Sequence, residues 1–199
     1  MQQGLLIVIS GPSGSGKGTL CGHLVERRPD IKISVSATTR APRPGEINGV
    51  NYYFLSREEF KKLVDADGFL EWAAIYSYMY GTPVGPVREM LDSGQDVILE
   101  IDVQGGLQIR ERFPGAILIF ITTPSREELE RRLKGRGTDD PREIDVRLKW
   151  ADTELMQAGG YDYVVINDSV DNAVRKLECI IEAEKSRPRR MIIPGWLNH

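Results

Sequence analysis

The sequence has little that would indicate a secreted, membrane-bound or zinc-stabilised protein. It contains only two cysteines, Cys21 and Cys179, and neither has a cysteine or histidine neighbour at ligand spacing, so neither a disulfide framework nor a zinc site is predicted. The N-terminal apolar run, 5–9, is short and follows no basic segment. No later run approaches the roughly 20 apolar residues of a membrane span. We therefore expect a cytoplasmic protein with no membrane contact.

The chain also lacks a strong charge of either sign. Its formal net charge is -3 and its pI is about 5.6, so no global positive field attracts a nucleic-acid backbone, and no nucleic-acid partner is expected. No repeat or low-complexity segment occurs. A length of 199 residues with 41% apolar composition is enough to bury one core, which favours a single domain.

Short apolar runs alternate with helical patterns along the chain. Four runs read as buried strands, namely 5–9, 97–101, 116–121 and 163–166, and each precedes a helical stretch. Continuous apolar strands alternating with helices are typical of a parallel sheet that is covered on both faces. The predicted fold class is α/β with a doubly wound parallel sheet.

Two segments interrupt this alternation. Residues 33–82 are rich in β pattern and predict an inserted subdomain, within which Ser56 and Glu59 form a capping box that opens a helix reaching about Asp65. A second box, Ser125 with Glu128, opens a helix ending near 135. A glycine-containing loop and a long helix over about 142–158 follow, which suggests a hinged helical lid.

These segments give a single domain in four parts. The core comprises 1–32, 83–124 and 159–186, the inserted subdomain 33–82 and the lid 125–158. A basic C-terminal tail, 187–199, is expected to be solvated or frayed at the surface.

A glycine-rich sequence between the first strand and the first helix carries the strongest chemical signal. It fits G-x-x-x-x-G-K, the pattern of a loop whose N–H groups cradle phosphates while a lysine reaches the β- and γ-phosphates. The predicted ATP-binding residues here are Gly11, Pro12, Ser13, Gly14, Ser15, Gly16, Lys17, Gly18 and Thr19. Where the pattern expects a magnesium-binding hydroxyl the chain has Gly18, with Thr19 one step later. Magnesium is therefore expected to be held largely by ATP oxygens and water, with Thr19 as a candidate ligand.

Several motifs together resemble those of guanylate kinases. They are the loop beginning Gly11-Pro12-Ser13-Gly14, the segment Ser36-Ala37-Thr38-Thr39-Arg40-Ala41-Pro42-Arg43, the segment Glu100-Ile101-Asp102-Val103-Gln104-Gly105, and Gly135-Arg136-Gly137-Thr138. The resemblance covers roughly residues 5 to 185 and implies a kinase that transfers a phosphoryl group from MgATP to GMP, with dGMP as a second substrate. It makes the inserted segment the GMP-binding subdomain.

The resemblance assigns the GMP phosphate to four side chains, Arg40, Arg43, Tyr52 and Tyr80. Guanidinium and phenol groups are suitable donors to a phosphate dianion. Taken without the resemblance, arginines beside Pro42 and Pro44 could equally be solvated surface residues.

The same resemblance assigns the guanine base to Glu71. A buried carboxylate can accept hydrogen bonds from the N1–H and N2–H groups of guanine, which adenine cannot match. Glu71 lies within an apolar run, where an unpaired charge would be costly, although a structural arginine could also be its partner. Ser36, Thr82 and Asp102 are further base-edge candidates.

Phosphoryl transfer needs cations around the moving group. By resemblance Arg132, Arg136 and Arg147 of the lid region provide them, alongside Lys17. Asp102 follows a buried strand at the edge where such sheets bind ligands, and is a candidate for holding magnesium through water. Glu100, two residues earlier, is a weaker candidate for the same task. Asn167, with Asp168, follows the last strand and is predicted to flank the adenine of ATP.

One segment departs from the family pattern. Guanylate kinases usually have glycine and asparagine ahead of Tyr80, where this chain has Ser77-Tyr78-Met79, so the backbone beside the base loses the freedom of glycine. Elsewhere His23 is interpreted as a surface or packing residue, and Trp150 and Met156 as a helical core face.

Two alternative functions remain open. A related small kinase could phosphorylate a sugar phosphate such as ribose bisphosphate, against which Glu71 and the paired arginines argue. A guanylate-kinase-like scaffold module could bind proteins instead of nucleotides, against which Lys17, Arg136 and Asp102 argue. A homo-oligomer is possible in either case.

Overall fold

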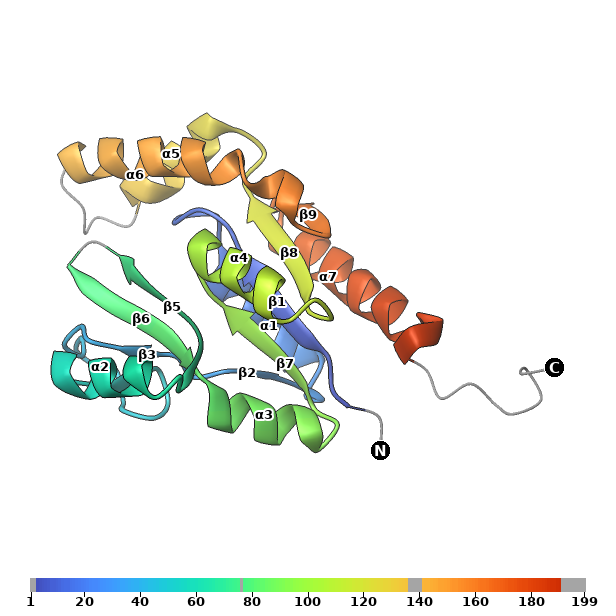
Figure 1. Ribbon diagram of the computed structural model, residues 1–199. Helices are drawn as coiled ribbons and strands as arrows, with labels where there is room; N and C mark the ends of the chain where they lie inside the picture. The colour runs from blue at the N-terminus through green and yellow to red at the C-terminus, as the bar shows by residue number, and fades with distance from the viewer. Residues whose placement is uncertain (1–2, 76, 136–140, 191–199) are drawn as a thin grey trace.

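The computed structural model describes residues 3–75, 77–135 and 141–190, and within them it has two sheets (Figure 1). The larger is a five-stranded parallel sheet with the order β2-β7-β1-β8-β9. Its strands are β1 (Leu6–Ser10), β2 (Ile31–Ile33), β7 (Asp96–Glu100), β8 (Ile117–Thr122) and β9 (Tyr163–Ile166). The predicted α/β class is confirmed. The short β2 is a strand that the sequence pattern missed.

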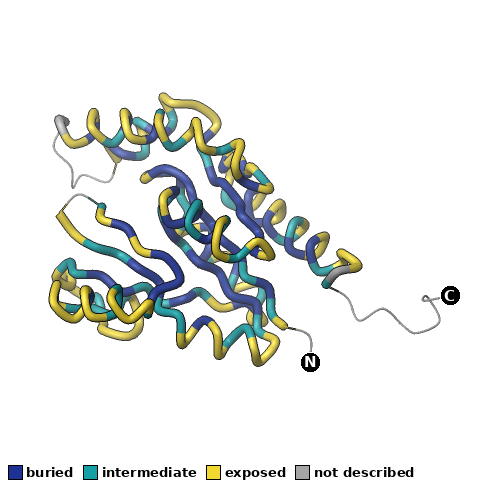
Figure 2. The backbone as a smooth tube through the Cα atoms, in the orientation of Figure 1, coloured by how far each residue is buried: buried dark blue, intermediate teal, exposed yellow. Residues whose placement is uncertain are grey.

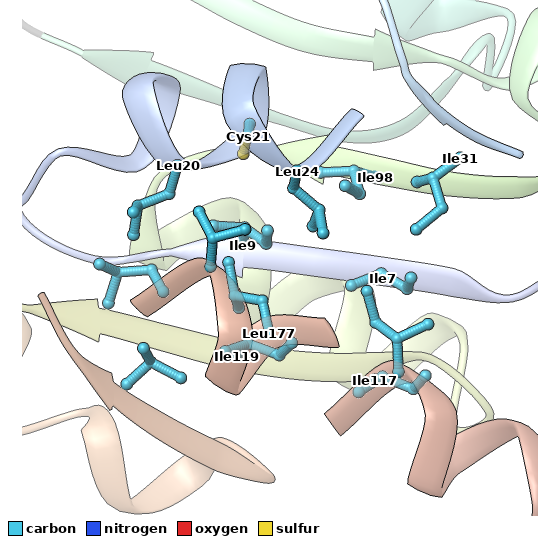
Figure 3. Close-up of a cluster of buried hydrophobic side chains, with 14 of the residues drawn as sticks. Ile7, Ile9, Leu20, Cys21, Leu24, Ile31, Ile98, Ile117, Ile119 and Leu177 are labelled. Carbon is cyan, nitrogen blue, oxygen red and sulfur yellow. The ribbon is translucent and has the colours of Figure 1, made fainter. Parts of the chain in front are cut away.

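Helices cover both faces of this sheet because its strands are apolar on both sides. Ile7 and Ile9 face α1 (Lys17–Arg27) and α7 (Val170–Lys185), as Figure 3 shows around Leu20, Leu24 and Leu177. Val8 faces the opposite side, where α3 (Val84–Asp92) and α4 (Val103–Arg112) pack. The central strands β7, β1 and β8 are largely buried on both faces (Figure 2), as expected for parallel strands between two helical layers, whereas Val164 and Ile166 of the edge strand β9 are exposed.

The inserted segment forms a separate four-stranded sheet with the order β4-β3-β6-β5. It comprises β3 (Ala37–Thr38), β4 (Tyr53–Phe54), β5 (Phe69–Ile75) and β6 (Tyr78–Pro83), with α2 (Arg57–Asp65) packed on one face. Phe60 of α2 stacks on Phe69 with ring centroids 4.5 Å apart. The capping box of Ser56 and Glu59 is confirmed, with both reciprocal hydrogen bonds present.

Two antiparallel helices form a third part above the carboxyl ends of the core strands (Figure 1), α5 (Arg126–Gly135) and α6 (Pro141–Leu155). Their small core of Leu129, Leu133, Ile144, Leu148 and Ala151 is distinct from the main one. The Ser125 hydroxyl accepts the Glu128 N–H as predicted. The Glu128 carboxylate, however, binds Arg131 and Arg132.

The chain returns to the core through a 3-10 turn, η1 (Ala158–Gly160), and after α7 it forms a second one, η2 (Pro188–Arg190). The expectation of a solvated tail is wrong for the start of this segment. Arg190 donates to the carbonyl of Gly115 at 3.0 Å and pairs with the buried Glu184 at 3.2 Å. No helix among the described residues has the length and apolar character needed to traverse a lipid bilayer.

Candidate nucleotide-binding site

The loop between β1 and α1 has the backbone geometry that its glycines predict. Gly11, Gly14 and Gly16 have φ of 137°, 92° and 93°, values that side chains other than glycine rarely adopt. Space is also restricted at Gly16, where an added Cβ would lie 2.4 Å from Nδ2 of Asn167. The loop therefore depends on glycine for both its conformation and its packing.

Lys17 lies at the start of α1 and its ammonium group points back at the loop. Nζ donates to the carbonyls of Gly11 at 2.6 Å and Pro12 at 3.2 Å. Burial lowers the pKa of Lys17, and the nearby carboxylates of Glu100, Glu154 and Asp102 partly offset this effect. The protein thus holds a desolvated cation among acidic groups beside a phosphate-binding loop.

A cavity of about 800 Å³ extends from this loop to the inserted sheet. One wall is the loop with the ends of β1 and β7, a second is β5 and β6, and a third is α6. The predicted residues that line it are Gly11, Ser13, Gly14, Gly16, Lys17, Gly18, Thr19, Ser36, Tyr52, Glu71, Tyr80, Asp102 and Arg147. Residues far apart in the sequence therefore share one space of a size typical for ligand sites.

Glu71 of β5 is the most deeply buried carboxylate in this cavity, with an exposed fraction of 3%. Its Oε1 accepts the hydroxyl proton of Thr82 at 2.6 Å. An added Cβ on Gly105 would lie 2.4 Å from Oε2, so that glycine leaves room for the carboxylate. Burial raises the pKa of Glu71 to about 7, helped by the negative Asp102, although the Thr82 hydrogen bond opposes the rise. No structural arginine holds Glu71 among the described residues.

Thr82 is fully buried and does not line the cavity, although it contacts the Glu71 carboxylate. Its only hydroxyl proton is donated to the carboxylate. Ser36, the other predicted base-edge hydroxyl, is half-buried and lines the cavity itself.

The four predicted phosphate donors are only partly brought together. Tyr52 and Tyr80 line the cavity with ring centroids 6.2 Å apart, and the Arg40 guanidinium lies 5.5 Å from the centre of the Tyr52 ring. Arg40 also pairs with Glu46 at 2.8 Å. Arg43 is exposed, and its backbone N–H donates to the same Glu46 carboxylate at 2.7 Å.

In the segment that departs from the family pattern, Ser77 lies in a turn, and Tyr78 and Met79 pair as ordinary β structure. Tyr78 is opposite Ile75 in the β5–β6 register. The Met79 N–H donates to Oγ1 of Thr39 at 2.9 Å, and its side chain packs against the α2 face of the small sheet. The carbonyl of Ser77 accepts from Arg57 at 3.0 Å.

A second, smaller cavity of about 350 Å³ lies on the other side of the loop, lined in part by Arg132, Asn167 and Asp168. Asn167 Nδ2 donates to the carbonyl of Ser15 at 2.8 Å. Arg132 donates to the carbonyl of Asn167 at 2.9 Å and contacts that of Ser15 at 3.3 Å. Arg132 thus ties α5 to the phosphate loop and the β9 turn.

The remaining predicted arginines differ in position. Arg147 of α6 donates to the Ser13 hydroxyl at 3.3 Å, so the long helix contacts the phosphate loop directly. Arg136 lies outside the described residues. Arg132 does not line the larger cavity, and its catalytic assignment stays a prediction.

Two carboxylates flank Lys17 at the end of β7. Asp102 is the N-cap of α4, where Oδ1 accepts the Gly105 N–H at 2.7 Å. Burial raises the pKa of both Asp102 and Glu100, an effect that Lys17 opposes. Among the described residues no group of three or more acidic, histidine or cysteine side chains is arranged to hold a metal ion.

Of the residues that the α6 region contributes to the site, sequence reasoning found only Arg147. Trp150, Thr153, Glu154 and Gln157 line the larger cavity together with Arg147. The interpretation of Trp150 and Met156 as a core face is wrong, since their exposed fractions are 51% and 81%. The helix buries a different stripe against α5. The spacing of Arg147 and Glu154, seven residues apart, was the available signal that one face carries polar groups. His23 is on the surface, as expected, beside Glu26.

The order of strand, glycine-rich loop, lysine and helix, beside a cavity that contains buried carboxylates, defines a P-loop nucleotide-binding protein. The family model described as guanylate kinase matches residues 3–184. The chain belongs to the guanylate kinase family, whose members are nucleoside-monophosphate kinases.

Named relatives and a solved structure agree with this assignment. A guanylate kinase of Caldanaerobacter subterraneus subsp. tengcongensis is 56% identical over 95% of this chain and 92% of its own length. One of Desulfitobacterium hafniense is 52% identical over 94% of each chain. The crystal structure of guanylate kinase from Anaplasma phagocytophilum is similar with a TM-score of 0.81 and 33% identity, covering 100% of this chain and 94% of the other.

Proposed function

We propose that this chain transfers the γ-phosphoryl group of ATP to GMP, giving ADP and GDP, and that it also accepts dGMP. The observation that carries the proposal is the position of Glu71, a buried carboxylate in the same cavity as Lys17 and the phosphate loop. A carboxylate suited to guanine and a lysine suited to a triphosphate in one cavity support phosphoryl transfer from ATP to GMP.

On the donor side, the N–H groups of the loop and the amino end of α1 would bind the phosphates of ATP. The smaller cavity beside Asn167 would hold the adenine, with Arg132 fixing the loop at that side. Lys17 would exchange its bonds to the loop carbonyls for bonds to the β- and γ-phosphates.

On the acceptor side, ionised Glu71 would accept the N1–H and N2–H groups of guanine. Thr82 would orient the carboxylate, and Ser36 and Asp102 would contact the base edge. The phosphate would bind Arg40, Tyr52 and Tyr80, joined by Arg43. These donors hold a dianion that is already nucleophilic, so no general base is required.

In the transfer step a phosphate oxygen of GMP forms a bond to the γ-phosphorus as the bond to the β,γ-bridging oxygen breaks and ADP leaves. Lys17, Arg147 and Arg136 would stabilise the negative charge on the moving group. Bound Mg²⁺ would offset the negative charge of the ATP phosphates. Asp102 and Glu100 would hold it through water, with Thr19 as the candidate loop ligand, since Gly18 has no hydroxyl.

The function is tested by ADP release from MgATP with GMP, dGMP, AMP, UMP, CMP and ribose bisphosphate offered separately. We expect strong activity confined to the two guanine nucleotides. Turnover of ribose bisphosphate would instead favour a sugar-phosphate kinase. No activity on any acceptor, together with no binding of ATP in a titration, would favour a protein-binding module.

The pH dependence of GMP binding offers a second test. Because the pKa of Glu71 is raised to about 7 in the free protein, protonation competes with guanine below that pH. We expect the KM for GMP to be flat above pH 8 and to rise by up to about tenfold per unit below pH 7.

The GMP phosphate itself titrates near pH 6, roughly, so the measurement needs a reference. The Glu71→Gln protein is this reference, because the GMP phosphate still titrates in its pH profile and the Glu71 carboxyl group is absent. Identical pH profiles for the two proteins between pH 6.5 and 8 would contradict the assignment.

A further inference from the structure

Trp150 is the only aromatic residue that α6 contributes to the larger cavity. The other aromatic lining residues, Tyr52 and Tyr80, come from the inserted subdomain. Half of the Trp150 surface is exposed, 51%, in a chain that buries most of its large apolar side chains. A large aromatic side chain left open inside a ligand-sized cavity is a typical binding feature, because ligand contact buries it.

The position of Trp150 on α6 follows from helix geometry. Arg147, Trp150 and Glu154 have the spacing i, i+3 and i+7, so they form one stripe of α6, and all three line the cavity. The buried stripe is made by Ile144, Leu148 and Ala151. The packing of α5 against α6 therefore leaves Trp150 with no place in the core.

Neighbours along the stripe indicate what Trp150 faces. Arg147 contacts Ser13 at the phosphate loop, whereas Glu154 lies where the charges of Lys17 and Asp102 shift its pKa. Trp150 is between them, about one helical turn from each. Glu71, on β5, lines the same cavity from another wall.

We propose that Trp150 is a binding residue for the acceptor nucleotide, whose indole packs on the nucleoside that Glu71 holds from another wall. The proposal rests on the proposed function and adds a residue to the acceptor site. It also gives α6 two tasks, with Arg147 at the transferred phosphoryl group and Trp150 at the nucleoside.

Steady-state kinetics of Trp150→Ala test the proposal. We expect the KM for GMP to rise by about tenfold or more, as for truncated base–aromatic contacts, with the KM for ATP within about twofold of wild type. Trp150→Phe should retain most of the affinity. Met156→Ala, an exposed apolar position just beyond the same helix and outside the cavity, serves as the matched control and should leave all constants unchanged.

A fluorescence measurement gives an independent readout. In a Trp72→Phe, Trp196→Phe protein Trp150 is the sole tryptophan, and GMP added without ATP should change its emission. The proposal is overturned if Trp150→Ala leaves the KM for GMP unchanged, lowers only kcat, or if the emission responds to ATP alone and not to GMP. Failure of the proposed function would show differently, as absence of GMP turnover in the wild-type protein.

Discussion

Lys17→Ala is expected to lower the rate of phosphoryl transfer to GMP by about a thousandfold or more, because one preorganised cation at the transferring group is lost. The protein should remain folded. Lys17 is a partly buried cation whose pKa is lowered by desolvation, and its removal relieves that cost. Single-turnover kinetics with saturating ATP and GMP measure the effect, and circular dichroism checks the fold.

Lys32→Ala is the matched control, since Lys32 is an exposed lysine on the short strand β2 and its loss should leave the rate unchanged. A Lys17→Ala protein with near-normal turnover would refute the placement of the triphosphate at the loop between β1 and α1. A protein that unfolds would be replaced in the test by Lys17→Met, which keeps the aliphatic stem.

Glu71→Gln is expected to reduce kcat/KM for GMP by about a hundredfold or more, with ATP affinity little changed. The glutamine amide presents an N–H group where guanine also presents N–H donors. One N–H of the protein would then face one N–H of guanine, and neither would have an acceptor in the buried site. Glu58→Gln, an exposed carboxylate on α2 in the same subdomain, is the matched control. Unaltered kcat/KM for GMP would remove Glu71 from the base site.

The same substitution should stabilise the free protein at alkaline pH. Folding raises the pKa of Glu71 from an ordinary 4.5 to about 7. The free energy of unfolding therefore falls as the pH rises through that interval, because the unfolded protein ionises more readily. The full cost above pH 7 is on the order of 3 kcal/mol. Thermal melts of wild type and Glu71→Gln should therefore coincide near pH 4.5 and separate above pH 7. The difference in melting temperature above pH 7 would measure how much stability the protein loses by burying the ionised Glu71 carboxylate in the binding site.

Local patterns were sufficient for most elements of the fold. The runs that form β1, β7 and β8 are continuous and apolar, because strands buried on both faces need no alternation. The run of the edge strand β9 is also apolar, although Val164 and Ile166 are exposed. Ser56 and Glu59 marked the start of α2, since a capping box is a local interaction. The short strand β2 carried too few residues for a pattern, and it exists because the neighbouring strand β7 supplies its hydrogen bonds.

The α6 helix shows where local pattern was not enough. Its sequence allows either of two stripes to be buried, and the larger apolar residues Trp150 and Met156 suggested the wrong one. Burial was decided by α5, whose Leu129 and Leu133 meet Ile144, Leu148 and Ala151. A helix by itself cannot specify which partner it will pack against.

The sequence by itself determined the phosphate loop, the parallel core and the family, because each depends on residues that are adjacent in the chain or on an apolar strand pattern. Only the tertiary structure decided which distant side chains share the cavity. It brought Glu71 against Thr82 and Gly105, left Trp150 exposed at the cavity wall, and left Arg43 exposed. These outcomes follow from how separate sheets and helices pack, and packing depends on contacts between residues far apart in the chain.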